Sequence, residues 1–318
     1  MPLISVILPA FNEEQTIADT IKDFHLALPD AEIWVINNHS VDETESIARE
    51  TISSIGCKGG IINEHRPGKG NAVRRAFLNI EADVYILADA DLTYPADHAH
   101  KLISPILNGD ADMAVGDRHA NGHYAMENKR AFHNFGNRLV RSLVNGLFNA
   151  KLYDIMSGYR ALNRDFVKSY PILVEGFEIE TDMTLHALDR RFRIIEIPIP
   201  YKDRPAGSFS KLNTFRDGAR VINTITKILR YYRPLAFFLI AAIIFMATGF
   251  TAAIPVFEDW LREGYIHHVP LAILATGLEI SAILLAAVGL ILDSTTHQDK
   301  CNFERELLKN SSSYTWKK

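Results

Sequence analysis

The amino-acid sequence predicts an α/β domain with a mostly parallel sheet and helices on both faces, followed by two membrane-spanning helices. Two observations lead to this fold class. From residue 4 to residue 88, short apolar runs alternate with segments of helical periodicity, which is typical of β-α-β units. Nearer the C-terminus, residues 234–257 carry no charged side chain and residues 269–292 carry only Glu279. Each segment exceeds the roughly 20 residues that a helix needs to cross a bilayer.

The individual elements follow from the spacing of the apolar residues. Strands rich in Val, Ile and Leu are expected at 4–8, 33–36, 60–62 and 84–88. Between them, the periodicity predicts helices at 13–28, 42–53 and 69–80. Beyond residue 97 the pattern is less regular, and we expect strands at 113–115 and 194–199 and a long helix at 129–149.

Charge on the flanks of the apolar segments predicts their orientation. Residues 204–233 contain seven Lys or Arg and one Asp, whereas residues 258–267 contain three acidic residues and one Arg. By the positive-inside rule the basic flank is cytoplasmic and the short connection is external. Apolar residues at helical spacing within the basic flank predict an amphipathic helix on the membrane surface. The expected parts are a cytoplasmic domain, this helix, a first span, an external loop, a second span and a cytoplasmic tail, at 1–212, 213–233, 234–257, 258–268, 269–292 and 293–318.

Glu279 lies near the middle of the second expected span. An ionisable side chain there costs about 3 kcal/mol unless it is protonated or paired. We expect Glu279 to face the other helix, with Thr248 or Thr251 as its partner, or to contact a second copy of the chain. Two buried core helices in a soluble protein are a weaker interpretation, because such helices are usually shorter and carry charges.

Several common kinds of site are disfavoured. Cys57 and Cys301 are the only cysteines, so there is no disulfide framework, and the 12 His form no zinc motif. No G-x-G-x-x-G follows the first strand, and Gly68-Lys69-Gly70 lacks the spacing of a P-loop. The net charge is −4, and no nucleic-acid partner is expected. The N-terminus lacks the pattern of a cleaved signal sequence, so the first domain is expected in the cytoplasm.

Asp89-Ala90-Asp91 is the main candidate for a metal site. The pair follows the apolar run 84–88, so both carboxylates would leave the sheet at the C-terminal end of a buried strand. Ligands bind open α/β sheets at that edge. Mg²⁺ commonly takes one or two carboxylates together with substrate phosphates. An ordinary strand-to-turn transition also places acidic residues there, so the pair alone does not decide between the two interpretations.

Six motifs in this order resemble those of the family 2 glycosyltransferases of the polyisoprenyl-phosphate type. This group includes enzymes similar to dolichyl-phosphate mannose synthase and to bactoprenol glucosyltransferases with two C-terminal spans, and the resemblance covers nearly the whole chain. The motifs are Leu8-Pro9-Ala10-Phe11-Asn12-Glu13-Glu14, Asn37-Asn38-His39-Ser40-Val41-Asp42-Glu43-Thr44, Gly68-Lys69-Gly70-Asn71-Ala72, Asp89-Ala90-Asp91, Ser157-Gly158-Tyr159-Arg160 and Arg204-Pro205-Ala206-Gly207-Ser208-Phe209-Ser210-Lys211.

The resemblance implies a GT-A fold, which is a single nucleotide-sugar-binding α/β domain. It implies metal-dependent transfer, with inversion, of one sugar from a nucleotide-sugar such as UDP-glucose to a polyprenyl phosphate like undecaprenyl phosphate. The reaction would occur at the cytoplasmic face of the inner membrane and supply glycan or cell-envelope modification. Implied partners are membrane lipids, a second copy of the chain, a lipid-linked-sugar flippase and a downstream glycosyltransferase.

Three alternatives bear on this function. A GDP-mannose-dependent mannosyltransferase stays open, because Asn37-Asn38-His39-Ser40 replaces the family's Asp-Asp-Gly-Ser and an amide both donates and accepts hydrogen bonds. A catalytically inactive membrane scaffold would be free to lose Asp89, Asp91 and the cluster at 204–211, yet all are intact. A processive polysaccharide synthase would need a Gln-x-x-Arg-Trp element, and the only glutamines are Gln15 and Gln298.

By resemblance, Asp89 and Asp91 hold Mg²⁺ or Mn²⁺ against the diphosphate of the donor. The implied donor-binding residues are Pro9, Asn12, Glu13, Asn38, Asp42, Lys69, Asp89 and Arg118. Two cations and two hydroxyls before the amphipathic helix are expected to bind the acceptor phosphate, namely Arg204, Ser208, Ser210 and Lys211. One extra residue between Gly207 and Lys211, relative to mannose synthases, leaves open which serine meets the phosphate.

The expected chemistry needs little base catalysis. A phosphate monoester has a second pKa of about 6 and is largely dianionic at neutral pH, so positioning and a stabilised leaving group matter most. A metal ion on Asp89 and Asp91 would stabilise negative charge on the leaving diphosphate, which places Asp91 among the catalytic residues. If a further carboxylate assists, Asp154 and Asp182 are the candidates, and Asp154 lies nearer the expected sugar site.

Overall fold

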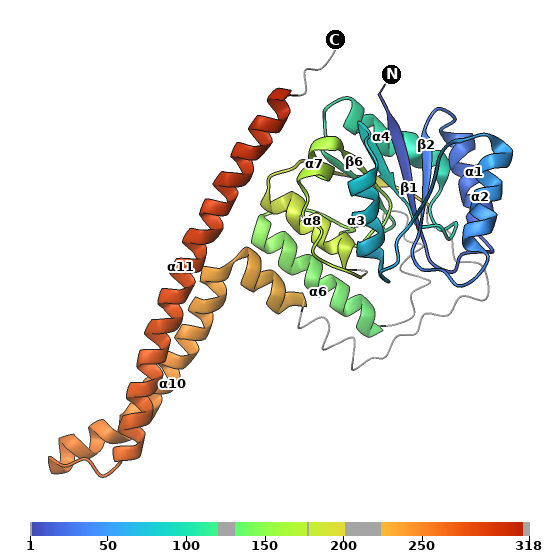
Figure 1. The fold of residues 1–318 in the computed structure, drawn as a ribbon. Helices are drawn as coiled ribbons and strands as arrows, with labels where there is room; N and C mark the ends of the chain where they lie inside the picture. Colours follow the sequence, from blue (N-terminus) through green and yellow to red (C-terminus); the bar gives the residue numbers. More distant parts are fainter. Residues whose placement is uncertain (1, 120–130, 177, 201–223, 314–318) are drawn as a thin grey trace. The chain divides into compact units, whose positions relative to one another are not determined.

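The computed structural model describes residues 2–119, 131–176, 178–200 and 224–313 (Figure 1). The chain forms two compact units, of which the first ends at Thr214 and the second begins at Phe215. The expected boundary at residue 212 falls outside the described residues, and so does most of the expected amphipathic helix. Of that helix, residues 224–232 are described, and they are helical.

The first unit is built on a seven-stranded sheet with the order β3-β2-β1-β4-β6-β5-β7. Its strands are β1 (Ile4–Ala10), β2 (Glu32–Asn37), β3 (Lys58–Asn63), β4 (Val84–Leu87), β5 (Met113–Asp117), β6 (Arg160–Asn163) and β7 (Ile194–Pro198). The pairs β1–β2, β1–β4, β2–β3 and β5–β7 are parallel, whereas β6 runs antiparallel to both β4 and β5. The predicted α/β fold with a mostly parallel sheet is confirmed, and β6 is a strand that the apolar pattern did not predict.

Helices cover both faces of the sheet because the strand side chains alternate between the faces. Val6 and Leu8 belong to one core cluster and Ile7 to the other. The first cluster is covered by α1 (Ile17–Ala27), α2 (Thr44–Ile55) and α4 (Ala99–Leu107), the last of which follows the short 3-10 helix η1 (Ala96–His98). The second is covered by α3 (Lys69–Asn79), α7 (Arg164–Ser169) and α8 (Ile179–Asp189), and α6 (Ala131–Phe148) contacts α8.

The direction of β6 brings a distant loop to the ligand edge of the sheet. Leu87 at the end of β4 and Val115 near the end of β5 both pair with Arg160, the first residue of β6. Because β6 is antiparallel to these strands, the loop that precedes it lies at the same edge as their carboxyl ends. Residues 154–159 are thereby placed beside Asp89 and Arg118, although they are far away in sequence.

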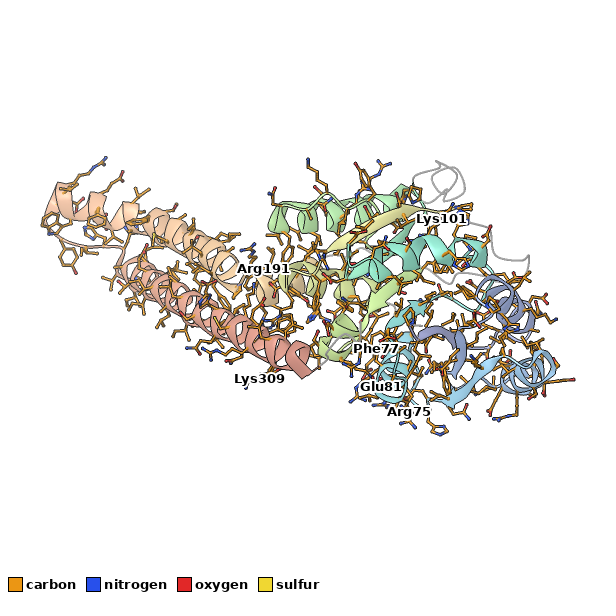
Figure 2. The ribbon with its side chains drawn as sticks, turned by 90° about the horizontal axis from the view of Figure 1, so that it is seen from above. Arg75, Phe77, Glu81, Lys101, Arg191 and Lys309 are labelled. Atoms are coloured by element: carbon orange, nitrogen blue, oxygen red, sulfur yellow. The ribbon has the colours of Figure 1, made fainter. Side chains whose placement is uncertain are left out.

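The second unit contains α10 (Pro234–Glu263) and α11 (Val269–Ser313), which pack against each other as a hairpin (Figure 1). Both helices are long and apolar enough to cross a membrane. Small side chains are buried between them, and large apolar side chains such as Phe250 and Ile283 are exposed. Figure 2 shows side chains projecting from both helices along their length. Two closely packed helices with apolar outer surfaces are typical of a membrane anchor. The buried small residues are Ala242, Gly249, Ala275 and Ala282.

The ends of the hairpin and the contact of Glu279 differ in detail from the expectations. Helix α10 runs beyond residue 257 and α11 beyond residue 292, so the connection is shorter than 258–268 and the tail stays helical as far as Ser313. Glu279 does face α10, where its carboxyl packs against Gly249. The hydroxyls of Thr248 and Thr251 instead donate to carbonyls of their own helix, at 2.8 and 2.7 Å. The predicted pairing of Glu279 with a threonine is therefore wrong for the described residues.

Candidate active site

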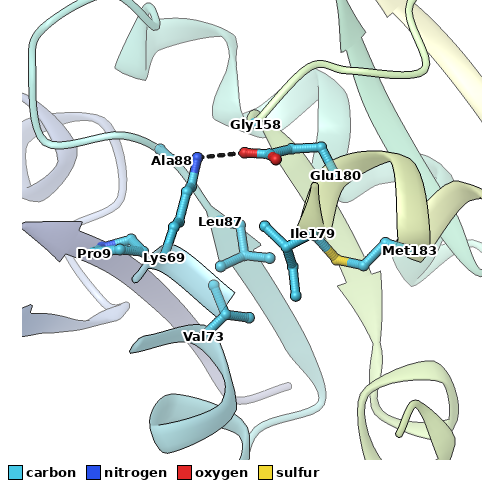
Figure 3. A pocket seen from close by; sticks show the side chains of 9 residues that line it. All are labelled: Pro9, Lys69, Val73, Leu87, Ala88, Gly158, Ile179, Glu180 and Met183. Atoms are coloured by element: carbon cyan, nitrogen blue, oxygen red, sulfur yellow. Dashed lines mark hydrogen bonds and ion pairs between the residues drawn. The ribbon is translucent and has the colours of Figure 1, made fainter. Parts of the chain in front are cut away.

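Lys69 stands at the centre of a charged cluster at the carboxyl edge of the sheet. It is the first residue of α3, and its ammonium forms ion pairs with Asp89, just after β4, and with Glu180, in the first turn of α8. The distance from Lys69 Nζ to Glu180 Oε1 is 2.6 Å. Figure 3 shows these two side chains meeting above the apolar side chains of Val73, Leu87 and Ile179. Burial lowers the pKa of Lys69, but Asp89 and Glu180 outweigh burial and raise it above its usual range.

Glu180 lies two residues before Asp182, which is one of the predicted catalytic residues. Asp182 accepts a hydrogen bond of 2.6 Å from the hydroxyl of Tyr170, and burial raises the pKa of the Asp182 carboxyl. Residues two positions apart on a helix face different directions, so only one of the two carboxyls reaches Lys69. The structure brings Glu180 to the cluster, and a catalytic role for Asp182 stays a prediction. Glu180 was overlooked because the sequence gives no register for α8 against α3.

Gly158 forms a wall of this cluster, where a larger residue would crowd the charged side chains. Its backbone N–H donates to the hydroxyl of Tyr94 at 2.9 Å. A Cβ atom at this position would lie 3.0 Å from Lys69 Nζ and 3.2 Å from Asp89 Oδ2. The close approach of the backbone therefore leaves the ammonium little space beyond the two carboxylates that it bridges.

Arg160, the last residue of the Ser-Gly-Tyr-Arg motif, supports the loop and has no exposed surface. Its guanidinium donates to the carbonyls of Ser157 at 2.8 Å and Ile155 at 3.0 Å, and to the Thr184 hydroxyl at 3.0 Å. Burial of the guanidinium lowers the pKa of Arg160. Since buried polar groups need hydrogen-bond partners, these bonds fix the path of residues 155–158 around Lys69 and Asp89.

Arg118 and Asp154 form a second buried pair, at the end of β5. Arg118 Nε and a terminal nitrogen donate to the two Asp154 oxygens at 2.7 and 2.9 Å, and the Arg118 backbone N–H donates at 3.2 Å. Asp154 is only 2% exposed. Burial raises the pKa of its carboxyl, but the bonds from Arg118 outweigh burial and hold the pKa below its ordinary value. Both Asp154 oxygens are thus engaged in holding Arg118, which favours a positioning role for Asp154 over that of a base.

The carboxylates of Asp89 and Asp91 suit a hard divalent cation, with further ligands from a substrate. Asp91 is 4% exposed, and its Oδ1 accepts hydrogen bonds from the backbone and hydroxyl of Thr93 at 3.2 and 2.5 Å. Among the described residues, no group of three or more His, Cys, Asp or Glu side chains could hold a metal ion. A cation here would therefore need oxygen ligands from the substrate, which matches the usual Mg²⁺ site of one or two carboxylates plus phosphates.

The loops after β1 and β2 are joined by side-chain hydrogen bonds. Asn12, which has a positive φ of 56°, accepts a bond of 2.9 Å from the backbone of Val41. Thr44 accepts a bond of 2.8 Å from the backbone of Glu13, and Asp42 accepts one of 3.2 Å from the backbone of Glu14. Asn12, Glu13 and Asp42 thus lie together at the ligand edge. Pro9 and Lys69 both line a cavity of about 10 Å³ (Figure 3). This cavity is too small for a sugar.

The hydrogen bonds of Asn38 show what an amide does where the Asp-Asp-Gly-Ser motif would place a carboxylate. Its Oδ1 accepts a bond of 2.8 Å from the Gly68 backbone, and its Nδ2 donates a bond of 2.7 Å to the Arg66 carbonyl. An ionised Asp accepts hydrogen bonds but cannot donate the second bond. The amide therefore fixes the loop that leads into Lys69, which gives Asn38 a structural task beside the donor contact predicted for it.

Gly68 and Gly70 allow another segment to cross the start of α3. The backbone N–H of Gly70 donates to the Glu175 carbonyl at 2.9 Å. A Cβ on Gly68 would lie 2.2 Å from that carbonyl oxygen, and a Cβ on Gly70 would lie 2.1 Å from the Val174 oxygen. The two glycines thus admit the backbone of residues 174–175, and this backbone holds the N-terminal end of α3 in place.

Gly70→Ala should lower the free energy of unfolding by about 1–3 kcal/mol, because the new methyl group would overlap a backbone oxygen and force the segments apart. Gly146→Ala is the matched control. It lies within α6 with nothing near its Cβ, and should raise stability by up to about 1 kcal/mol because Ala favours helix. Denaturant unfolding of both variants measures the difference. Equal stability of the two would contradict the crossing arrangement.

The four residues predicted to bind the acceptor phosphate lie outside the described residues, and their roles stay predictions. They are Arg204, Ser208, Ser210 and Lys211.

Comparison with known proteins decides the family. Residues 5–170, just over half of the chain, match the model of the family described as Glycosyl transferase family 2. The chain belongs to this family. It is therefore a glycosyltransferase, and its sheet is that of a GT-A-like domain.

Two curated relatives match this glycosyltransferase over most of its length. Glycosyltransferase AglJ of Haloferax volcanii is 28% identical, and the match covers 91% of this chain and 92% of AglJ. A dolichyl-phosphate hexose transferase of the same organism is 28% identical, over 71% of this chain and 93% of its own length. Among solved structures, the glucosyl-3-phosphoglycerate synthase of Mycobacterium tuberculosis superimposes with a TM-score of 0.56. That match is 22% identical and covers 73% of this chain and 81% of the synthase, so it shows the shared fold.

Proposed function

We propose that this glycosyltransferase moves a single sugar, with inversion, from a nucleotide-sugar to a polyprenyl phosphate at the cytoplasmic face of the membrane. The observation that carries the proposal is the cluster of Asp89, Lys69 and Glu180 at the ligand edge of the sheet, in a chain that also has two apolar helices. The dolichyl-phosphate hexose transferase among the relatives supports a lipid phosphate as the acceptor.

The donor end of the reaction is assigned to the residues at the sheet edge. Asp89 and Asp91 would hold Mg²⁺ or Mn²⁺, which supplies a Lewis acid for the charge that develops on the leaving diphosphate. Lys69 and Arg118 provide cations close to the phosphate oxygens, because each is held at the sheet edge by a buried carboxylate. The loops that carry Pro9, Asn12, Glu13, Asn38 and Asp42 are proposed to bind the nucleoside. The solved synthase of the same fold holds Mn²⁺ with UDP-glucose.

The acceptor end is assigned by charge and by the membrane anchor. The basic residues of 204–233 would keep this flank on the cytoplasmic side, where they attract anionic lipid phosphates. Arg204, Ser208, Ser210 and Lys211 are the proposed ligands of the acceptor phosphate. A dianionic phosphate attacks the anomeric carbon directly, so the enzyme mainly has to position two substrates and stabilise the leaving group.

The donor is proposed to be a UDP-sugar such as UDP-glucose, with GDP-mannose as the alternative. A relative from Pyrococcus furiosus is a dolichol-phosphate mannosyltransferase, 30% identical over 66% of this chain, and it supports the alternative. Asn38 is engaged in holding the loop at Gly68, so the altered second motif does not select between the two bases.

The function is tested by incubating membranes that contain the protein with polyprenyl phosphate and labelled UDP- or GDP-sugars. We expect one donor to give a lipid-linked sugar, and EDTA to reduce the rate about 100-fold or more, because the leaving diphosphate would lose its counter-cation. Mg²⁺ or Mn²⁺ added in excess should restore the rate. Membranes without the protein are the control.

Two results would contradict the proposal. Formation of product at the same rate in EDTA would contradict the proposed role of the metal ion. A complete lack of product with every donor would favour a catalytically inactive scaffold instead.

A further inference from the structure

We propose that Lys69 competes with the divalent cation for Asp89, and that Glu180 receives the Lys69 ammonium when the cation binds. The inference rests on the proposed function in so far as it assigns a cation to Asp89. It adds a task for Glu180, which the motifs of the sequence did not single out. It also predicts that the enzyme binds the divalent cation weakly when no nucleotide-sugar is present.

The geometry places one ammonium between two carboxylates from different elements. Lys69 contacts Asp89 after β4 and Glu180 on α8, and the exposed fractions of the Lys69 and Glu180 side chains are 11% and 8%. The backbone of Gly158 closes one side, since even a Cβ atom there would lie 3.0 Å from the ammonium nitrogen. Lys69 is thus confined to a short path between Asp89 and Glu180, along which its flexible stem can turn.

The Lys69 ammonium and a divalent metal ion compete for Asp89 because both are positively charged. A lysine ammonium in contact with a carboxylate repels a divalent ion that approaches the same oxygens, and this repulsion is strong where water is largely excluded. Without Glu180, displacement of Lys69 would leave a buried ammonium unpaired, which is costly. With Glu180 at 2.6 Å, the ammonium keeps a carboxylate partner when Asp89 is taken.

The arrangement favours loading of the cation together with the donor. The second carboxylate, Asp91, already accepts hydrogen bonds from Thr93, so Asp89 has to supply much of the attraction. A diphosphate brings oxygens that attract both the divalent ion and the Lys69 ammonium. Lys69 therefore holds Asp89 until a nucleotide-sugar arrives, and then stands beside its phosphates.

The test measures Mn²⁺ binding by electron paramagnetic resonance with the full-length protein in detergent, without nucleotide or acceptor. We expect Lys69→Met, which keeps the apolar stem, to bind Mn²⁺ about tenfold more tightly than wild type. Glu180→Gln should bind it severalfold more weakly, because Lys69 is then left to Asp89 alone. In the Lys69→Met background, however, Glu180→Gln should have almost no effect, because no ammonium remains to be received.

A matched control separates this exchange from general charge effects. Lys22 pairs with Asp19 on the surface of α1, and Lys22→Met removes the same charge without touching the cluster. It should leave Mn²⁺ binding unchanged. If Lys69→Met is poorly folded, Lys69→Gln tests the same loss of charge.

Two outcomes would overturn the inference. One is unchanged or weaker Mn²⁺ binding by Lys69→Met. The other is an equal loss from Glu180→Gln in both backgrounds, since Glu180 would then act on the ion directly. The binding assay is independent of sugar transfer. If Lys69→Met binds Mn²⁺ more tightly but the wild-type protein gives no product with any donor, the proposed function is refuted and this inference stands.

Discussion

Asp89→Asn should reduce sugar transfer about 1000-fold while the protein stays folded. The amide keeps the shape of the side chain but loses the charge that is proposed to hold the cation and, through it, the leaving diphosphate. The fold should persist because Lys69 keeps its ion pair with Glu180. The measurement is the rate of lipid-linked sugar formation with the donor that the panel identifies, together with the thermal unfolding of the same preparation.

The control for Asp89→Asn is Asp30→Asn. Asp30 is exposed between α1 and β2, so its replacement should change neither the rate nor the stability appreciably. Transfer by Asp89→Asn at a rate within about threefold of wild type would show that Asp89 does not bind the cation.

Asp154→Asn should lower the free energy of unfolding by about 3 kcal/mol and the transfer rate about 100-fold. The substitution leaves the mostly buried Arg118 guanidinium without its carboxylate, and breaking a buried ion pair is strongly destabilising. Arg118 would also keep at most one of the two side-chain bonds that aim it, because an amide has a single acceptor oxygen, so a phosphate contact at the sheet edge would be misplaced. Arg118→Lys, which cannot form both bonds, should reduce the rate to a similar extent.

The effect of Asp154→Asn on stability should depend on pH in a defined direction. The pKa of Asp154 is depressed below its ordinary value in the folded protein, so its contribution to stability is fully present above the unfolded pKa of about 4. That contribution is lost as the pH falls through the folded pKa. Denaturant unfolding of wild type and variant should therefore give a constant difference from neutral pH down to about pH 4, and a shrinking difference below it.

Asp112→Asn is the matched control for Asp154→Asn. Asp112 forms the same two-bond pair with Arg193, at 3.0 and 3.1 Å, but the Arg193 side chain is 57% exposed. Its loss should cost only about 1 kcal/mol and leave transfer unchanged. If Asp154 were instead a base, the acidic limb of the pH profile of kcat would change in Asp154→Asn. An unchanged profile at a lower rate is the expected result.

Local sequence patterns were sufficient for the elements of the first half of the fold. The predicted strand at 84–88 and helix at 69–80 differ from β4 and α3 by a single residue at one end. Apolar periodicity works here because each strand alternates between two buried faces and each helix covers one of them. Composition and length, without periodicity, located the two apolar helices.

The contacts between distant segments were not predictable from those patterns. Strand β6 is short and begins with Arg160, so nothing in its composition marked it as a strand inserted between β4 and β5. Its antiparallel direction places Gly158 against Lys69 and brings Asp154 to Arg118. The need for glycine at Gly68 and Gly70 likewise became clear only from the backbone of residues 174–175, which crosses them.

The sequence by itself determined the β-α-β order, the acidic pair at the end of β4 and the two apolar helices, because periodicity and composition are properties of neighbouring residues. The tertiary structure decided that Glu180, and not Asp182, meets Lys69, and that both oxygens of Asp154 hold Arg118. The physical reason is that a side chain's partner depends on the register of one element against another. That register is set by the packing of the whole core, to which every segment contributes.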